Sequence, residues 1–288
     1  ILLIPQLLLS GVVVDFDELN KKLITQGKVP VIGEIMTSRW AFEAIMVSQF
    51  MENEYQEDFY EVEKRIADAE YKKLYHIPVL ESKIQFVERN LNNDDRQMQK
   101  QVDNAIAIIR KEIGDELDVI GHEHFPQFSK LRREEFDQQV AGATQEFLEI
   151  LKQYYTSKRN KAFDDKESIL REKNKTQDSR EEFLQIKRDY HNERIQDIVK
   201  NSEETNRVIE GKGKLIQKIF PIFMEPEPEH LLDFRTQFYA PVKFIAGNYI
   251  NTYTFNIFVI WLMTFLLFIT LYFDLLRKLI EFFERKKR

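Results

Sequence analysis

A long apolar segment near the C-terminal end constrains this chain more than any other feature. Residues 255–273 contain no charged side chain, no proline and no glycine, and residues 244–254 before them are also uncharged. At a rise of about 1.5 Å per residue, a helix over 255–273 would cover roughly 28 Å, close to the ~30 Å hydrocarbon layer of a bilayer. The sequence therefore predicts a transmembrane helix in an integral membrane protein.

The basic residues around this segment predict the direction in which it crosses the membrane. Two precede it nearby, Arg235 and Lys243. Six follow it: Arg277, Lys278, Arg285, Lys286, Lys287 and Arg288. Because basic residues favour the cytoplasmic side, we expect a cytoplasmic C-terminus and extracytoplasmic soluble residues before 244. The tail 275–288 is either an amphipathic helix on the inner membrane surface or an ordinary charged helix end.

The first fourteen residues are also nearly all apolar. Only Gln6 and Ser10 are polar, and Pro5 would kink a helix. This stretch is too short to span a bilayer, and it has no basic region of the kind that begins a signal peptide. We expect the outer end of a preceding membrane helix, with a short buried or re-entrant segment as the alternative.

A strongly charged region, 51–243, lies between the two apolar ends. The mean hydropathy of the whole chain, −0.44, averages over this contrast and so conceals it. The chain has no cysteine, which favours a bacterial envelope over an animal cell surface. The net charge is −6 and the basic residues are dispersed, so we expect no nucleic-acid partner. We divide the chain into 1–50 (the end of a membrane helix plus re-entrant helices), 51–243 (an extracytoplasmic helical stalk) and 244–288 (the last membrane helix and a cytoplasmic tail).

Between residues 51 and 210 the composition is that of long helices, with little glycine or proline and much Gln, Glu, Lys, Arg and Leu. Two apolar series have helical spacing: Val102, Ile106, Ile109, Ile113 and Ile120, and Phe136, Val140, Ala143, Phe147, Ile150 and Tyr154. The second series alternates steps of four and three, as a coiled-coil seam does. We therefore expect an all-α membrane protein with a long helical hairpin or coiled-coil insertion.

Proline and glycine predict where these helices stop. Pro78 is expected to interrupt the first helix, and residues 121–126 to form a turn between the two long helices. The proline-rich stretch 221–230 is expected to be a rigid extended linker, because each proline fixes its own φ and disfavours helix before it.

No motif in this chain indicates catalysis, so we assign no catalytic, cofactor or metal residues and leave open whether the protein is an enzyme. His122 and His124 are two residues apart and do not share a helix face, so a helix-end turn is a better interpretation than a metal pair. Lys212 and Lys214 lack the GxxxxGK[ST] frame of a phosphate-binding loop. The many carboxylates are interpreted as solvated helix faces.

One segment, 31–50, carries more specific information. Its apolar residues occupy more than one helix face, which indicates burial in protein or lipid. It also contains Arg39 and Glu43, which can pair at positions i and i+4. Charge at membrane depth is costly and marks a function or a fixed partner. The alternative is a helix at the headgroup level with both charges facing water.

Residues 1–50 resemble the permease half of ABC transporters of the type-2 exporter class, above all the G subfamily of White-like exporters. The resemblance rests on Ser10-Gly11-Val12-Val13, Arg39-Trp40-Ala41-Phe42-Glu43 and Gln49-Phe50, and by position alone on 244–288. It implies that Val12 and Val13 form the aliphatic plug of the transport pathway. It also implies that Arg39, Trp40, Phe42 and Glu43 lie in a re-entrant helix hairpin.

The same resemblance implies the permease segment of an ATP-driven exporter in a bacterial cytoplasmic (inner) membrane, with an amphiphilic or lipid-like substrate. It implies contact with membrane lipids and a homodimer or a second permease chain. ATP and Mg²⁺ would bind at a nucleotide-binding domain upstream or in a partner, and no cofactor would bind this chain. The insertion 51–243 is longer than the family's usual loop, and the loop cysteines of animal members are missing. We expect this insertion to be a stalk that reaches an envelope partner.

A different function class also fits most of the sequence. A membrane-anchored helical scaffold or sensor of the bacterial envelope accounts equally well for residues 51–288. It leaves residues 10–50 unexplained, and for that reason we rank it second.

Overall fold

The structure is a computed structural model that describes residues 4, 6, 28–211, 213–228 and 230–275. The chain forms two compact units, unit 1 with residues 1–51 and 224–288 and unit 2 with residues 52–223. The described part is mostly helical, as predicted. The expectation of an all-α protein is wrong in one respect, because each unit also contains a short β-hairpin. Val12 and Val13, and the tail from residue 276, lie outside the described residues.

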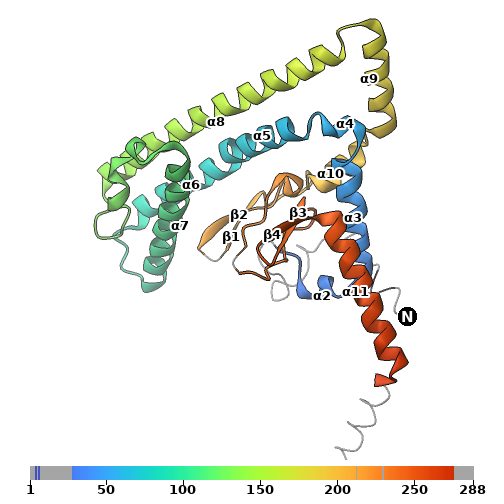
Figure 1. Ribbon diagram of the computed structural model, residues 1–288. Helices are drawn as coiled ribbons and strands as arrows, with labels where there is room; N and C mark the ends of the chain where they lie inside the picture. The colour runs from blue at the N-terminus through green and yellow to red at the C-terminus, as the bar shows by residue number, and fades with distance from the viewer. Residues whose placement is uncertain (1–3, 5, 7–27, 212, 229, 276–288) are drawn as a thin grey trace, which may run out of the picture. The chain divides into compact units, whose positions relative to one another are not determined.

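Unit 2 consists of helices and one hairpin (Figure 1). Its α-helices are α4 (Glu54–Glu57), α5 (Tyr60–Tyr71), α6 (Ile77–Asn90), α7 (Arg96–Ile120), α8 (Gln138–Lys173), α9 (Gln177–Tyr190) and α10 (Glu193–Val199). A π-helical turn, Lys72–His76, joins α5 to α6, and short 3₁₀ turns cover His122–His124, Pro126–Lys130 and Pro221–Phe223. The hairpin pairs β1 (Val208–Gly211) with β2 (Lys214–Gln217).

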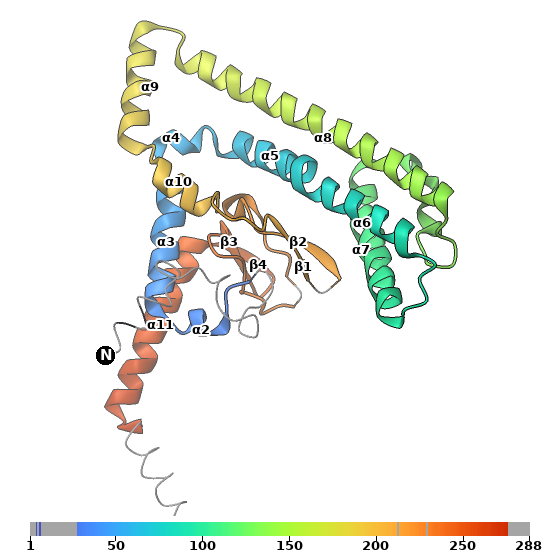
Figure 2. The same ribbon diagram turned by 180° about the vertical axis from the view of Figure 1, so that it is seen from behind.

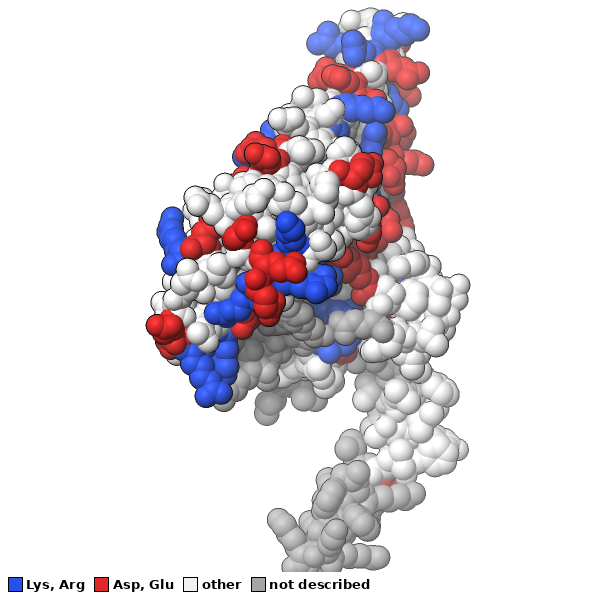
Figure 3. All heavy atoms as spheres, turned by 90° about the vertical axis from the view of Figure 1, so that its left-hand side faces the viewer, with Lys and Arg blue, Asp and Glu red and all other residues white. Residues whose placement is uncertain are grey.

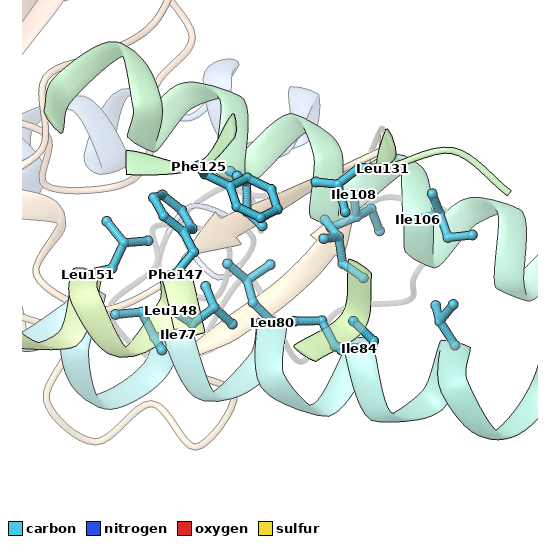
Figure 4. Close-up of a cluster of buried hydrophobic side chains, with 14 of the residues drawn as sticks. Ile77, Leu80, Ile84, Ile106, Ile108, Phe125, Leu131, Phe147, Leu148 and Leu151 are labelled. Carbon is cyan, nitrogen blue, oxygen red and sulfur yellow. The ribbon is translucent and has the colours of Figure 1, made fainter. Parts of the chain in front are cut away.

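The core of unit 2 lies where α6, α7 and α8 meet. Figure 4 shows Leu80 and Ile84 of α6 close to aliphatic side chains of α7, with Phe125 over Phe147. The rings of Phe125 and Phe147 are stacked with their centroids 5.1 Å apart. The apolar series predicted for α7 is buried from Val102 to Ile113 and half-buried at Ile120, so this prediction is confirmed.

The coiled-coil seam predicted along α8 contains buried positions in its first half, as expected, but exposed positions in its second half. Phe136, Val140 and Phe147 are buried, but Ile150 is 41% exposed and Tyr154 38% exposed. The other buried positions are Ala141, Thr144, Leu148, Leu151, Tyr155 and Ala162. Because α8 packs against both α5 and α6, it buries a wider face than a two-helix seam would, and this face is rotated away from Ile150.

The helix does not break at Pro78. α6 follows the π turn directly, and Pro78 lies in its first turn. A missing N–H is tolerated in the first turn of a helix, and a π turn shifts the hydrogen-bond pairing next to it. The predicted interruption is therefore a π turn within a continuous helical path.

The turn predicted at 121–126 is confirmed. α7 ends at Ile120, and Gly121 has φ = +104°, a conformation that favours glycine. A Cβ at this position would lie 2.4 Å from a carboxylate oxygen of Glu123. The linker expected at 221–230 begins with the buried 3₁₀ turn, and its other described residues have no helix or strand.

Ion pairs join α5 and the end of α4 to α8. They are Asp58–Lys173, Glu63–Lys166, Arg65–Asp165, Asp68–Lys158 and Glu70–Arg159. The residue numbers of the partners generally fall along α8 as they rise along α5, because the two helices are antiparallel, as Figures 1 and 2 show. Half-exposed pairs each contribute at most about 1 kcal/mol, so they fix the register of the helices more than they stabilise them. Figure 3 shows acidic and basic side chains interspersed on the visible face of unit 2.

Glu63 is the most buried acid of this series, and it gives a prediction about pH. Its carboxylate accepts hydrogen bonds from Lys166 Nζ at 2.7 Å, Lys200 Nζ at 3.0 Å and Gln56 Nε2 at 3.2 Å. Burial raises the pKa of Glu63, but the two lysines outweigh this effect and hold the pKa below its ordinary value. A depressed pKa stabilises the fold above the unfolded value of about 4.3, and the contribution is lost as the pH falls through the folded value.

We therefore expect the free energy of unfolding to fall less steeply between pH 6 and pH 3 in Glu63→Gln than in the wild type. Denaturant unfolding followed by far-ultraviolet circular dichroism measures this slope. Glu61→Gln, at an exposed position of the same helix, is the matched control and should keep the wild-type slope. Identical slopes for both variants would contradict the role of Glu63.

Unit 1 combines helices from both ends of the sequence. Its described elements are α2 (Val31–Glu34), α3 (Thr37–Met51), β3 (Val242–Ile245), β4 (Asn248–Asn251) and α11 (Thr252–Tyr272). Ala246 and Gly247 connect the strands with φ = +52° and +84°. Two positive φ values are typical of a type I′ turn, which suits the right-handed twist of a hairpin. The apolar run upstream of the membrane segment is therefore a hairpin, and the helix begins at Thr252.

α11 is long and apolar enough to cross a membrane, and it is the one such helix among the described residues. Its first turns pack against α3, and the two helices lie side by side in both views (Figures 1 and 2). Further along the helix the large apolar side chains are exposed, Trp261 at 70% and Leu271 at 71%. Length, composition and exposure agree with the predicted membrane helix.

Candidate functional site

The most unusual site in unit 1 is a group of charged side chains enclosed between α3, β3 and the first turn of α11. We call it the Glu43 cluster, and it comprises Glu34, Arg39, Glu43, Lys243 and Asn256. Glu43 and Asn256 are 0% exposed and Arg39 is 1% exposed. α3 supplies two of these residues because positions 39 and 43 are one turn apart on the face that also buries Trp40 and Val47.

The carboxylate of Glu43 is the centre of this cluster. Its Oε1 accepts hydrogen bonds from Lys243 Nζ at 2.7 Å and from the Tyr239 backbone N–H at 3.2 Å. Its Oε2 accepts one from Asn256 Nδ2 at 2.8 Å. Arg39 Nη1 lies 3.4 Å from the same oxygen. Charged partners and three hydrogen bonds compensate the desolvation of this carboxylate.

The surrounding contacts fix the cluster to three elements. Asn256 Nδ2 also donates to the Trp40 carbonyl at 3.1 Å, which ties α11 to α3. Lys243 Nζ also donates to Thr236 Oγ1 at 2.6 Å. Since Lys243 of β3 and Asn256 of α11 both donate hydrogen bonds to α3, the cluster determines how α3, β3 and α11 pack.

Arg39 balances two carboxylates. Its Nη1 lies 3.5 Å from Glu34 Oε2, in addition to the contact with Glu43. Its guanidinium carbon lies 4.0 Å from the centre of the Trp40 ring, a cation–π geometry. Two basic and two acidic side chains therefore share the enclosed space. The cluster is electrically balanced when all four are ionised, which suits a position next to an apolar helix.

Burial and the neighbouring positive charges have opposite effects on the pKa values of Glu34 and Glu43. Burial raises the pKa of Glu43, but Arg39 and Lys243 outweigh it, so the pKa lies below its ordinary value. Burial raises the pKa of Glu34 more than Arg39 and Lys243 lower it, so this pKa lies above its ordinary value. Glu43 is thus the fixed anion of the cluster, and Glu34 is its more readily protonated member.

Two of the four residues predicted for a re-entrant helix, Arg39 and Glu43, belong to this cluster. The pairing of Arg39 with Glu43 is confirmed, and the alternative with both charges facing water is wrong. Trp40 is buried, and its ring lies 5.9 Å from that of Phe255. Phe42 contacts the rings of Phe238 and Tyr239 outside the cluster.

Sequence reasoning missed Lys243 and Asn256. In the sequence, Lys243 stands out only as a basic residue near the membrane segment, and Asn256 only as part of its uncharged run. A signal was present, because Lys243 is the one charged residue in 236–273. A lone charge in an apolar run indicates a fixed partner elsewhere in the fold.

A second buried polar network lies in unit 2 beside the π turn. His76 Nε2 lies 2.8 Å from Glu112 Oε2, and the Leu215 N–H of β2 donates to Glu112 Oε1 at 2.7 Å. Glu116 accepts from Lys72 Nζ and from Tyr155 OH, both at 2.5 Å. Burial raises the pKa of Glu112, but the hydrogen bonds from His76 and Leu215 outweigh it and hold the pKa low. This network joins α7, α8, β2 and the π turn.

The other histidines give no site. His122 and His124 lie in an exposed 3₁₀ turn, as the sequence predicted, and His122 is paired with Asp118 at 3.2 Å. Among the residues that the structure describes, no group of three or more His, Cys, Asp or Glu side chains is arranged to hold a metal ion.

The described residues therefore define a mostly helical protein in which one helix is long and apolar enough to cross a membrane, with the buried Glu43 cluster beside that helix. Comparison with known proteins adds nothing to this class: no protein-family model, curated protein or solved structure matches the chain.

Proposed function

We propose that this chain is a permease segment of an ATP-driven ABC exporter. In this proposal α11 is the last membrane helix and α2–α3 the re-entrant hairpin. Unit 2 is an extracytoplasmic insertion, and the C-terminus is cytoplasmic in a bacterial inner membrane. The chain binds no nucleotide itself, and ATP and Mg²⁺ act at a nucleotide-binding domain upstream or in a partner. An amphiphilic or lipid-like substrate is exported along a pathway that includes Val12 and Val13.

The observation that carries the proposal is the burial of Arg39 and Glu43 against α11. In the resembled family the Arg-aromatic-Ala-Phe-Glu motif belongs to a re-entrant helix. Here α3 runs antiparallel to α11, since Glu43 contacts Asn256 while Thr37 Oγ1 lies 3.8 Å from Met263 Sδ, near the midpoint of α11. A helix that enters beside a spanning helix and returns has this arrangement, and its charges are tolerated because they are paired.

Unit 2 supports the second part of the proposal. Unit 2 has its own hydrophobic core and an ion-paired surface, which are typical of a helical domain in water. α11 instead exposes large apolar side chains. We propose that unit 2 is a stalk for an envelope partner and that the permease functions as a homodimer or with a second permease chain.

ATP hydrolysis by the natural full-length protein in nanodiscs tests the proposal. We expect vanadate-sensitive ATPase activity. It should be several-fold lower in Arg39→Ala, because that substitution removes one positive charge from the Glu43 cluster between α3 and α11. His122→Ala, in an exposed turn of unit 2, is the control and should keep wild-type activity. A folded protein without any ATPase activity, alone or with a co-purified subunit, would overturn the exporter.

A membrane-anchored scaffold or sensor of the envelope is the second candidate. The observation that favours it is the series of ion pairs along α8, which fixes the register of α8 against α5 and has no part in any transport chemistry. It predicts an intact, folded protein that co-purifies with envelope components and hydrolyses no ATP.

A further inference from the structure

A short loop in unit 1 exposes apolar side chains next to α11. Leu231 is 69% exposed and Leu232 is 64% exposed. Backbone hydrogen bonds from Asp233 N–H to the His230 carbonyl and from Phe234 N–H to the Leu232 carbonyl, both 3.0 Å long, close the loop into a tight turn. Single exposed leucines are common on protein surfaces, but adjacent ones on an ordered turn are less so.

The loop is bonded to the segment that leads into α2. Val29 N–H donates to the Thr236 carbonyl at 3.2 Å, and Arg235 Nη2 donates to the Val29 carbonyl at 2.8 Å. α2 itself exposes Val31 at 60%, and the following Ile35 is 64% exposed. Two neighbouring segments of unit 1 therefore present large aliphatic side chains outside α11.

Both segments lie alongside the first half of α11 and not beyond its N-terminal end. The Phe234 ring is stacked on that of Phe255 with centroids 6.0 Å apart, and α2 directly precedes Thr37, which contacts Met263. Both views show α2 beside the middle of α11 (Figures 1 and 2).

The acidic side chain of the loop is neutralised within the protein. Asp233 is paired with Lys28 at 2.7 Å, and its side chain is only 7% exposed. The guanidinium of Arg235 donates from Nη2 to the Val29 carbonyl at 2.8 Å. Asp233 therefore places no unpaired negative charge beside the two exposed leucines.

We infer that the loop carrying Leu231 and Leu232 inserts into the outer leaflet of the bilayer beside α11, so that lipid acyl chains cover the two leucines. The lipid is identified by continuity, because α11, with its exposed apolar side chains, belongs to the same unit and stacks Phe255 on Phe234 of the loop. The loop is a further membrane contact, in a region that the sequence assigned to the extracytoplasmic stalk. This inference rests on the proposed function in one respect, that α11 spans the membrane.

The absence of cysteine from the sequence makes a direct test possible. Leu232→Cys in the 288-residue chain would be labelled with the fluorophore NBD and reconstituted into phosphatidylcholine vesicles, with or without doxyl-labelled lipid. Leu266→Cys on α11 and Val119→Cys at the end of α7 serve as lipid and water references. Both positions are exposed, at 53% and 59%.

We expect the Leu232→Cys probe to be quenched at least twofold by doxyl lipid, as the Leu266→Cys probe is, with blue-shifted emission. Emission and quenching equal to those of the Val119→Cys probe, with the Leu266→Cys probe quenched, would overturn the inference and leave the membrane span intact. If the Leu266→Cys probe is also unquenched, the membrane span fails, and the inference fails with it. Near-ultraviolet circular dichroism of each variant checks that unit 1 is folded.

Discussion

Replacing Lys243 by methionine should destabilise unit 1 by ~3–5 kcal/mol, because it leaves the carboxylate of Glu43 enclosed without its closest positive partner. Lys243 Nζ is 2.7 Å from Glu43 Oε1, and both side chains are at most 1% exposed. Asn256, Tyr239 N–H and Arg39 remain as partners, but Arg39 is shared with Glu34. Removing one member of a buried pair costs more than the pair itself contributes.

Tryptophan fluorescence can follow this loss in the cluster itself. The sequence has two tryptophans, Trp40 and Trp261. In a Trp261→Phe background the remaining Trp40 is 2% exposed and lies under the Arg39 guanidinium, so its emission reports on the cluster. Denaturant unfolding in detergent micelles, read at Trp40, gives the change in stability.

A double substitution is the matched control for the charge argument. Glu43→Gln with Lys243→Met removes one charge of each sign, so the cluster stays balanced. We expect it to be more stable than Lys243→Met alone, although it changes one more residue. A single variant as stable as the wild type, or a double variant less stable than the single one, would show that charge balance does not hold α3 to α11.

Leu151→Ala should destabilise unit 2 by ~2–5 kcal/mol, while Ile150→Ala should change its stability by less than about 1 kcal/mol. Both are truncations of a four-carbon side chain at adjacent positions of α8. Leu151 is 0% exposed in the core with α6 and α7, whereas Ile150 is 41% exposed. Loss of buried methyl groups removes transfer free energy and leaves a cavity, which an exposed position does not.

Urea unfolding followed at 222 nm measures both variants, since most of the helices that the structure describes lie in unit 2. The comparison decides the register of α8 directly. If Ile150→Ala were the more destabilising variant, the heptad seam through Phe136, Phe147, Ile150 and Tyr154 would be the packed face, and the wider face described above would be wrong.

The sequence by itself determined the features that depend on local composition and period. The uncharged run 255–273 predicted α11, and the spacing of Val102, Ile106, Ile109 and Ile113 predicted the buried face of α7. Gly121 predicted the turn after α7. Each of these follows from properties of neighbouring residues: apolar length, helical periodicity and a positive φ that favours glycine.

Only the tertiary structure decided which residues meet across long separations in sequence. The buried face of α8 depends on its two neighbours, so a period of 3.5 residues alone placed Ile150 and Tyr154 inside when they are outside. The Glu43 cluster joins residues 200 or more positions apart, Glu43 with Lys243 and Asn256. The spacing of Arg39 and Glu43 indicated that the two can pair and left a water-facing helix as the alternative, but a local pattern contains no information about the lysine that neutralises Glu43. Electrostatic compensation in an apolar setting is a property of the packed fold, because the free energy of a buried charge depends on every group that surrounds it.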